Sequence, residues 1–253
     1  MNYKILGSGP EKILTMHNWF CDCTSYEPMM PYLDTEQYTY AFMDLRGYGK
    51  AKEIKGSYTV EEASQDAMKV ASSLGWTEFH VMGHSMSGMI AQKMALNSQI
   101  KSVIAITPVP ACGTPKPPEL MGFLEAAATG NDEFAKDCIH LLTSQRYSDC
   151  VAKQMIKAWK NCSIPEARIA YLHMFSNTDF SNQIKGLKTP MLVIFGAHDF
   201  KGEEELMRKT FLTWYPNAQL QRCEGAGHFP TQEAPIYLAS LVEKFMSSLV
   251  ASP

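Results

Sequence analysis

The feature that most constrains this chain is a turn of small residues between a predicted strand and a predicted helix. The apolar run Phe79–Met82 leads into Gly-His-Ser-Met-Ser-Gly, whose central serine is Ser85, and the helix-like stretch Met89–Leu96 follows. A sharp strand-turn-helix unit lifts one side chain above the edge of a sheet as a nucleophile elbow. Such a turn needs small residues two positions either side of the serine, where Gly83 and Ser87 stand. The alternative is a Ser/Gly-rich loop that only joins a strand to a helix.

Residues that would activate the serine follow in a suitable order. A serine alcohol is a weak nucleophile near neutral pH, and it needs a general base that a third group orients. The strand-like run Met191–Phe195 leads to Asp199, and the run Gln219–Cys223 leads to His228. Parallel strands place such ends at the edge of the sheet where ligands bind. We therefore expect Ser85, Asp199 and His228 to form one site.

Each of the two partner residues also has a structural interpretation. Asp199 would then cap a helix that starts near Gly202, and His228 would be a loop histidine whose hydrogen bonds are satisfied locally. The sequence alone leaves both alternatives open.

The chain resembles the alpha/beta hydrolase superfamily over nearly its whole length, except for a middle insert. The resemblance rests on the turn at Ser85, on Phe-Gly-Ala-His-Asp ending at Asp199, and on Gly-Ala-Gly-His-Phe-Pro around His228. Residues 15–19 (Thr-Met-His-Asn-Trp) and 44–49 (Asp-Leu-Arg-Gly-Tyr-Gly) resemble the family's oxyanion loop and its Asp-x-Arg-Gly-x-Gly turn. The resemblance implies that Ser85 attacks an ester-like carbonyl, that His228 transfers the proton, and that Asp199 orients the imidazole.

Two backbone N–H groups are expected to form an oxyanion hole. Met86 follows the nucleophile at the start of a helix, and the resemblance supplies Trp19 as the second donor. The sequence departs from the family twice: Asn18 follows His17 where the family usually has glycine, and Ser87 delays the second glycine of Gly-x-Ser-x-Gly. Asparagine tolerates a left-handed backbone better than most residues. The loop therefore either keeps the conformation of the family or directs the backbone N–H of Trp19 elsewhere.

Strands and helices alternate over most of the chain, which predicts an α/β fold with a mostly parallel sheet and helices on both faces. The helix expected at Val60–Leu74 has Thr59 as its N-cap, with Glu62 three residues later. Besides the runs above, the predicted strands and the last two helices are Lys12–His17, Thr39–Asp44, Lys101–Thr107, Glu203–Trp214 and Thr231–Leu249.

Residues 108–186 break the alternation and predict a helical cap inserted after the sixth strand of the fold. The core would then comprise residues 1–107 and 187–253. A proline-rich run opens the insert, and consecutive amphipathic segments follow: Pro118–Ala128, Glu133–Thr143, Asp149–Cys162 and Pro165–Phe175.

Four apolar residues are predicted to wall a substrate pocket beside Ser85. They are Phe20, Trp159, Met155 and Phe229. The alternative for the two cap residues, Trp159 and Met155, is simple core packing.

Composition bounds the partners and the compartment. A net charge of −3 argues against a nucleic-acid surface, so the expected partner is a small-molecule substrate, with the protein a monomer or homodimer. No signal peptide and no apolar stretch of about 18 residues is recognised, so the default compartment is the cytoplasm. Seven cysteines at irregular spacing indicate reduced thiols. Cys21 and Cys23 lack a second pair with zinc-site spacing, so neither a metal nor a cofactor is expected.

The predicted reaction is hydrolysis of a small ester, lactone or thioester through an acyl-enzyme. A serine at the elbow argues against the dehalogenase and epoxide-hydrolase branches, which carry an aspartate there. The same fold also serves cofactor-free carbon–carbon hydrolysis, cyanohydrin cleavage and oxygenation. A ligand receptor that retains the three residues and signals through cap movement is a further alternative. The natural substrate, the oligomeric state and any movement of the cap do not follow from the sequence.

Overall fold

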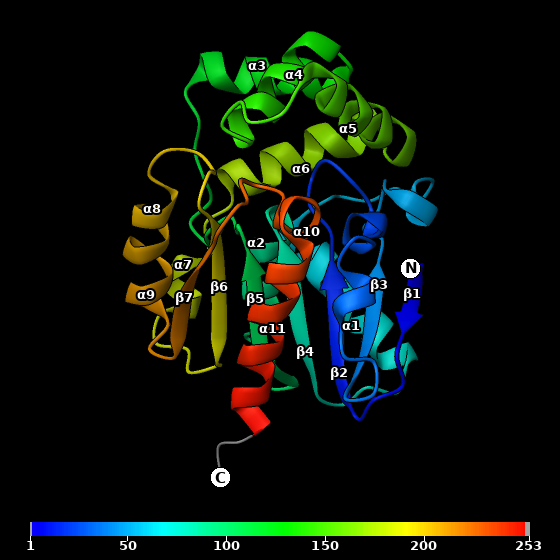
Figure 1. Ribbon diagram of the computed structural model, residues 1–253, viewed down its shortest axis with the longest axis vertical. Helices are drawn as coiled ribbons and strands as arrows, with labels where there is room; N and C mark the ends of the chain where they lie inside the picture. Colours follow the sequence, from blue (N-terminus) through cyan, green and yellow to red (C-terminus); the bar gives the residue numbers. More distant parts are fainter. Residues whose placement is uncertain (1, 251–253) are drawn as a thin grey trace.

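The architecture is a sheet covered by helices, with further helices above one edge of the sheet (Figure 1). The computed structural model describes residues 2–250. Within them the seven strands lie in the order β1-β3-β2-β4-β5-β6-β7, and only β1 is antiparallel to its neighbour. The strands are β1 (Tyr3–Leu6), β2 (Glu11–Met16), β3 (Tyr38–Met43), β4 (Phe79–His84), β5 (Ile100–Ile106), β6 (Met191–Gly196) and β7 (Ala218–Cys223). The predicted mostly parallel α/β sheet is confirmed, whereas β1 was not expected.

Alternate side chains of the central strands enter two separate cores. Leu14 of β2 and Val81 of β4 join one cluster with Met89 of helix α2 (Met86–Met94), and α1 (Val60–Ser73) packs on the same face. Ile13 and Met82 point the other way, into a second cluster that α11 (Pro235–Val250) covers. A strand turns successive side chains to opposite faces, so central strands buried on both sides are apolar throughout.

The helix α1 begins as predicted. The hydroxyl of Thr59 accepts a hydrogen bond of 3.1 Å from the backbone N–H of Glu62. The carboxylate of Glu62 accepts one of 2.9 Å from the backbone N–H of Tyr58. Both bonds satisfy donors at the helix start that have no partner inside the helix.

Four helices lie over the carboxyl ends of the parallel strands (Figure 1). They are α3 (Pro118–Thr129), α4 (Asp132–Leu142), α5 (Asp149–Cys162) and α6 (Pro165–Asn177). Among residues 2–250 they follow the fifth strand rather than the predicted sixth. The short helix α7 (Ser181–Ile184) lies level with the sheet in Figure 1. The division of the chain at residues 108–186 therefore stays a prediction.

Two helices that were predicted as continuous are each broken. The stretch Glu203–Trp214 forms α8 (Glu203–Lys209) and α9 (Phe211–Trp214), which are separated at Thr210, where φ is −104° and ψ is −78°. The stretch Thr231–Leu249 forms α10 (Pro230–Glu233) and α11, which begins at a proline that has no N–H to continue the preceding turn. Within residues 2–250 no helix combines the length and the apolar character needed to cross a bilayer. The cytoplasmic location stays a prediction.

Candidate active site

Ser85 occupies the sharp turn between β4 and α2. Its backbone has φ 57° and ψ −116°, a strained conformation for a residue that is not glycine. The turn is close enough that a Cβ atom at position 83 would lie 2.2 Å from the carbonyl oxygen of Ser87, so Gly83 is required there. Strained backbone of this kind, which costs about 1–3 kcal/mol, gathers at functional sites. The strand-turn-helix unit is confirmed, and the role of Ser85 as the nucleophile stays a prediction.

The fold brings together the three polar residues that were predicted to meet. The hydroxyl oxygen Oγ of Ser85 lies 2.8 Å from Nε2 of His228, and Nδ1 of His228 lies 2.7 Å from Oδ2 of Asp199. The three residues are between 7 % and 9 % exposed, so little water competes for these bonds. A carboxylate only accepts, so Nδ1 carries the proton and Nε2 is free to accept from Ser85. This is the arrangement of a nucleophile, a base and an orienting acid.

The alternative role of Asp199 as a helix cap is wrong. The N-cap of α8 is Gly202, which has no capping side-chain bond. The Asp199 carboxylate instead accepts the N–H of Phe200 at 2.8 Å and the N–H of His228. Burial alone would raise the pKa of Asp199, but the charge and the hydrogen bond of His228 bring that pKa below its ordinary value. Asp199 is therefore ionised.

A second carboxyl group, which sequence reasoning missed, lies behind Asp199. Glu203, the first residue of α8, is 3 % exposed. Carboxylate oxygens of Glu203 and Asp199 and a ring nitrogen of His228 lie within 4.8 Å of one another. Its Oε2 has no hydrogen-bond partner among residues 2–250. Two neighbouring buried carboxyl groups do not both ionise. Burial, followed by the charge of Asp199, raises the pKa of Glu203 well above its ordinary value, so Glu203 keeps its proton and its O–H donates a hydrogen bond to the Asp199 carboxylate.

Nothing in the local sequence distinguishes Glu203 from an ordinary surface residue. It opens a run of three glutamates, and acidic residues are common in the first turn of a helix. The only signal is its position four residues after Asp199.

The two predicted oxyanion donors flank the serine in different ways. Met86 is the first residue of α2, and N–H groups in a first helical turn have no partner within the helix. Trp19 lies in the loop after β2 and lines the same cavity as Ser85. Its indole N–H donates to the carbonyl of Arg168 at 2.8 Å, which anchors this loop to α6. The roles of the Met86 and Trp19 backbone N–H groups stay predictions.

The first departure from the family pattern, Asn18, ties three loops together. Its Oδ1 accepts the N–H of Phe20 at 2.7 Å, and its amide nitrogen lies 3.2 Å from Nδ1 of His84. The other ring nitrogen of His84 lies 2.7 Å from the carbonyl oxygen of His228 and must donate to it. Burial, followed by neighbouring His228, lowers the pKa of His84 to about 3, so the ring is neutral. Nδ1 is then an acceptor, and the amide of Asn18 donates to it.

The second departure, Ser87, also joins the nucleophile turn to the loop after β2. Its hydroxyl donates a hydrogen bond of 2.5 Å to the carbonyl oxygen of His17. Glycine is needed at position 88, where the backbone runs close to Pro108, because a Cβ atom there would lie 2.3 Å from Cβ of Pro108. The ring of His17 bridges the backbone of Asn18 and Leu45. His17 and His84 thus connect loops.

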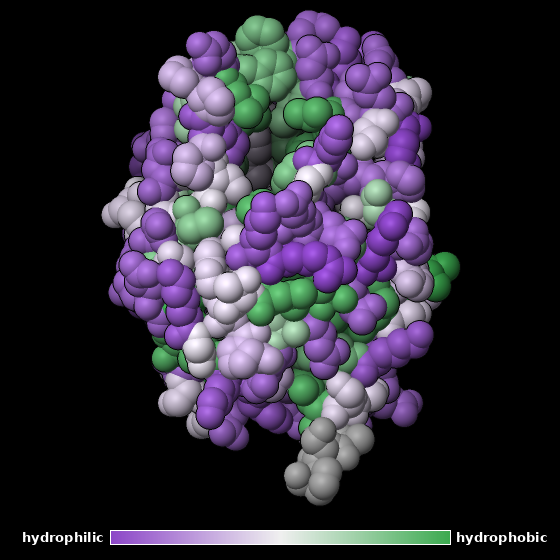
Figure 2. Space-filling model, turned by 90° about the vertical axis from the view of Figure 1, so that its left-hand side faces the viewer, coloured by the Kyte–Doolittle hydropathy of each residue, from purple (hydrophilic) through white to green (hydrophobic). Residues whose placement is uncertain are grey.

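A cavity of about 380 Å³ opens beside Ser85 and His228. Figure 2 shows a hollow bordered by hydrophobic side chains on the face that it presents. Three exposed apolar residues, Leu120, Leu141 and Phe200, belong to the lining. The remaining lining residues are Trp19, Phe20, Thr107, Pro108, Val109, Thr114, Pro115, Lys116, Leu124, Cys138, Leu142, Phe175 and Leu206.

Of the four predicted pocket residues, only Phe20 lines this cavity. Trp159 is fully buried behind it, with its ring centroid 4.6 Å from that of Phe20. Phe229 is 1 % exposed and contacts Phe20 edge-on at 5.7 Å. Met155 packs against the core from α5 and does not reach the lining. These three residues are therefore not part of the cavity lining, because an apolar sequence pattern predicts burial but not which wall a residue contacts.

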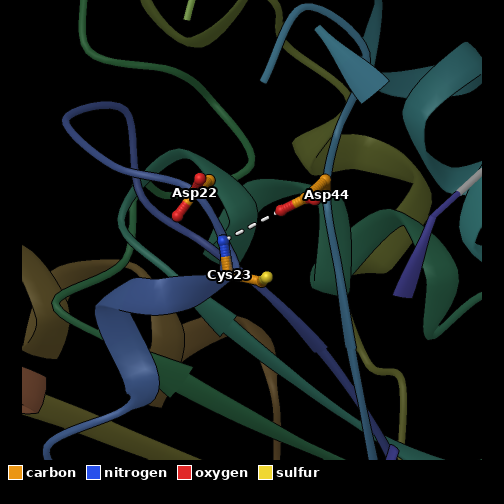
Figure 3. Close-up of side chains that lie close together, drawn as sticks. All are labelled: Asp22, Cys23 and Asp44. Carbon is orange, nitrogen blue, oxygen red and sulfur yellow. Dashed lines mark hydrogen bonds between the residues drawn. The ribbon is translucent and has the colours of Figure 1, made fainter. Parts of the chain in front are cut away.

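One further cluster holds residue types that bind metals. Ligand atoms of Asp22, Cys23 and Asp44 lie within 4.8 Å of one another (Figure 3). Both oxygens of Asp44 are already occupied, since Oδ1 accepts the N–H of Cys23 at 3.0 Å and Oδ2 that of Lys50 at 2.9 Å. Oδ1 of Asp22 accepts the N–H of Thr24. Burial, followed by the charge of Asp44, raises the pKa of the Cys23 thiol, which disfavours the thiolate that a metal needs. The cluster fixes loops.

The sequence profile of the alpha/beta hydrolase fold matches residues 6–235. The chain belongs to this family. It is 24% identical over 242 residues to a non-heme haloperoxidase of Rhodococcus erythropolis, covering 89% of this chain and 88% of that protein. It is 23% identical over 214 residues to the pimeloyl-[acyl-carrier protein] methyl ester esterase of Vibrio atlanticus, covering 78% and 79%. The fold is similar to the crystal structure of a bromoperoxidase from Bacillus anthracis, with TM-score 0.84, 18% identity and coverage of 97% and 94%.

Proposed function

We propose that this hydrolase-family protein cleaves a small ester through an acyl-enzyme formed on Ser85. The observation that carries the proposal is the hydrogen-bonded line from Ser85 Oγ through His228 to Asp199, with bonds of 2.8 and 2.7 Å, beside an apolar cavity. Lactones and thioesters present the same carbonyl carbon to the serine, so they belong to the same proposal.

In the first half-reaction, Ser85 Oγ forms a bond to the carbonyl carbon while its proton passes to Nε2 of His228. The backbone N–H groups of Met86 and Trp19 are the donors proposed to stabilise the resulting oxyanion. One such donor contributes about 3–4 kcal/mol to lowering the barrier. Asp199 acts as a positioning residue, because its carboxylate fixes the tautomer of His228 and stabilises the imidazolium.

Collapse of this intermediate breaks the bond to the alcohol, which takes the proton from His228 and departs. A water molecule then attacks the acyl group with His228 as the base, and the carboxylic acid leaves Ser85 in its starting form. The sum is one ester and one water giving one acid and one alcohol.

The relatives are named for different reactions, one a haloperoxidase and one a methyl ester esterase. Family membership therefore does not choose the reaction. The Ser85–His228 pair favours acyl transfer, because the hydroxyl and its base are already within hydrogen-bond reach.

Hydrolysis of a series of p-nitrophenyl esters tests the proposal. Ser85→Ala and His228→Ala are expected to lower kcat by about 10⁴- to 10⁶-fold while the protein stays folded. Ser64→Ala, at a half-buried position of α1, and His173→Ala, at an exposed position of α6, change residues outside the cavity lining, so they serve as controls and are expected to leave turnover unchanged. Turnover that survives Ser85→Ala would overturn the proposal. A strong ligand-induced rise in melting temperature without Ser85-dependent turnover would favour the receptor alternative.

A further inference from the structure

The cavity beside Ser85 contains a single basic side chain among apolar walls. Apart from His228, Lys116 is the one ionisable nitrogen in the lining, and no aspartate or glutamate belongs to it. Lys116 lies in the segment that enters α3, and its ammonium group stands 5.2 Å from the ring centroid of Phe175. The cavity therefore holds one positive charge and no fixed negative charge.

Lys116 has no counter-ion within the described part of the chain. Its Nζ donates to the carbonyl oxygen of Thr114 at 2.7 Å and to the Thr114 hydroxyl at 2.8 Å. An ammonium group has three N–H donors, so one is left over. No carboxylate among residues 2–250 forms an ion pair with this group.

The charge persists at neutral pH although the group is half-buried. Burial lowers the pKa of Lys116 to about 8, which leaves the ammonium form dominant near pH 7. The ionisable group that interacts electrostatically with Lys116 is the thiol of Cys138 in α4. Burial raises the pKa of this thiol to about 12. Cys138 therefore stays neutral, and a partly desolvated cation without a partner gains from any anion placed beside it.

We propose that the substrate is an ester whose apolar acyl chain ends in a carboxylate, and that Lys116 binds this carboxylate while Ser85 attacks the ester carbonyl. The inference rests on the proposed function. We place the carboxylate on the acyl part of the ester, because that part stays bonded to Ser85 between the two half-reactions and so occupies the cavity. The apolar walls fit the methylene chain, and the single cation selects its end.

Two p-nitrophenyl esters of equal chain length test this directly: the hexanoate and the half-ester of adipate, in which a carboxylate replaces the terminal methyl group. The measured quantity is the ratio of kcat/KM for the adipate half-ester to that for the hexanoate. Wild-type protein is expected to favour the adipate half-ester by about tenfold to one-hundredfold, the range of a hydrogen bond to a charged group. The preference is expected to vanish in Lys116→Met, to survive in part in Lys116→Arg, and to remain in Lys188→Met, which removes an exposed lysine elsewhere.

The same ratio measured against pH needs no variant. It is expected to fall as the pH rises through about 8, because the anion then loses its cation. Any effect of pH on the steps that both esters share cancels in the ratio.

The inference and the proposed function fail in different ways. A ratio near one in wild-type protein, or a preference that persists in Lys116→Met and at high pH, would overturn the inference while Ser85-dependent hexanoate hydrolysis keeps the proposed function. Failure of both esters to react in a Ser85-dependent way would overturn both.

Discussion

The side-chain amide of Asn18 donates a hydrogen bond of 3.2 Å to Nδ1 of His84, which ties the loop after β2 to the nucleophile turn. His84 also contacts the loop of His228, because its second ring nitrogen donates a hydrogen bond to the carbonyl oxygen of His228. One buried network with a neutral His84 ring therefore connects the loop after β2, the turn at Ser85 and the loop of His228. The asparagine that departs from the family pattern supplies a bond that glycine lacks.

Replacing Asn18 by glycine is expected to weaken the protein although it restores the family residue. The change removes the acceptor of the Phe20 N–H and leaves Nδ1 of His84 buried without a donor. We expect the free energy of unfolding to fall by about 1–3 kcal/mol, the cost of leaving buried polar groups unpaired. Urea denaturation measures the change. Asn18→Ala removes the same bonds without adding backbone freedom, so it separates the two effects, and an Asn18→Gly protein as stable as wild type would contradict the network's role.

Ser87→Gly restores the second family residue and is expected to destabilise the protein by a similar route. The carbonyl oxygen of His17 loses its hydroxyl donor, at a cost of about 1–2 kcal/mol. Because Asn18 and Ser87 join the same two segments, their effects should not add. A double-mutant cycle by urea denaturation with Asn18→Gly checks this, and strictly additive losses would show that the two bonds act independently.

Asp199→Asn is expected to lower kcat by about 10⁴-fold with the fold intact. Asparagine can donate to Nδ1 of His228, which then favours the tautomer whose Nε2 carries the proton and cannot accept from Ser85. Steady-state hydrolysis of a p-nitrophenyl ester measures the loss. Asp137→Asn, at an exposed position of α4, is the matched control and should keep full activity. Equal activity of the two variants would mean that Asp199 does not orient His228.

The proton on Glu203 predicts how stability depends on pH. Its pKa is raised on folding, so the native state holds more protons than the unfolded state above about pH 4.5, the ordinary glutamate value. Stability contributed by this proton is complete below that pH and is lost as the pH rises towards the folded pKa, by at most about 1.4 kcal/mol per pH unit.

Glu203→Gln keeps the shape of the side chain and an N–H donor but does not titrate. Relative to wild type, this variant is therefore expected to gain in unfolding free energy as the pH rises, in urea denaturation from mildly acidic to mildly alkaline buffers. Glu204→Gln, one residue along α8, is the control. Curves for wild type and Glu203→Gln that run parallel would show that Glu203 is already ionised in the native state.

The fold and the meeting of Ser85, His228 and Asp199 were predictable because they depend on local patterns and on a known topology. Apolar runs ended by Gly83 or Asp199 predict strand ends, and a parallel sheet places those ends at one edge. The broken helix at Thr210 and the strand β1 were missed, since both depend on tertiary packing that outweighs local propensity.

The details around the serine depend on three-dimensional contacts that spacing does not encode. Glu203 and Lys116 look like surface residues of helix starts in the sequence, yet one contacts Asp199 and the other lines the cavity. Conversely, Trp159 looks like a pocket residue, but it is buried against Phe20 and does not line the cavity. Amphipathic spacing identifies a buried face and leaves its neighbours undefined.

Covalent labelling of the serine tests the central claim most directly. Wild-type protein is incubated with a fluorophosphonate probe, digested and mapped by mass spectrometry, beside Ser85→Ala, His228→Ala and the control Ser64→Ala. The account predicts probe on the peptide that carries Ser85 in wild type and Ser64→Ala, none on that peptide in Ser85→Ala, and strongly slowed labelling in His228→Ala. Labelling that is absent from Ser85 in wild type, or that proceeds equally fast without His228, would contradict it.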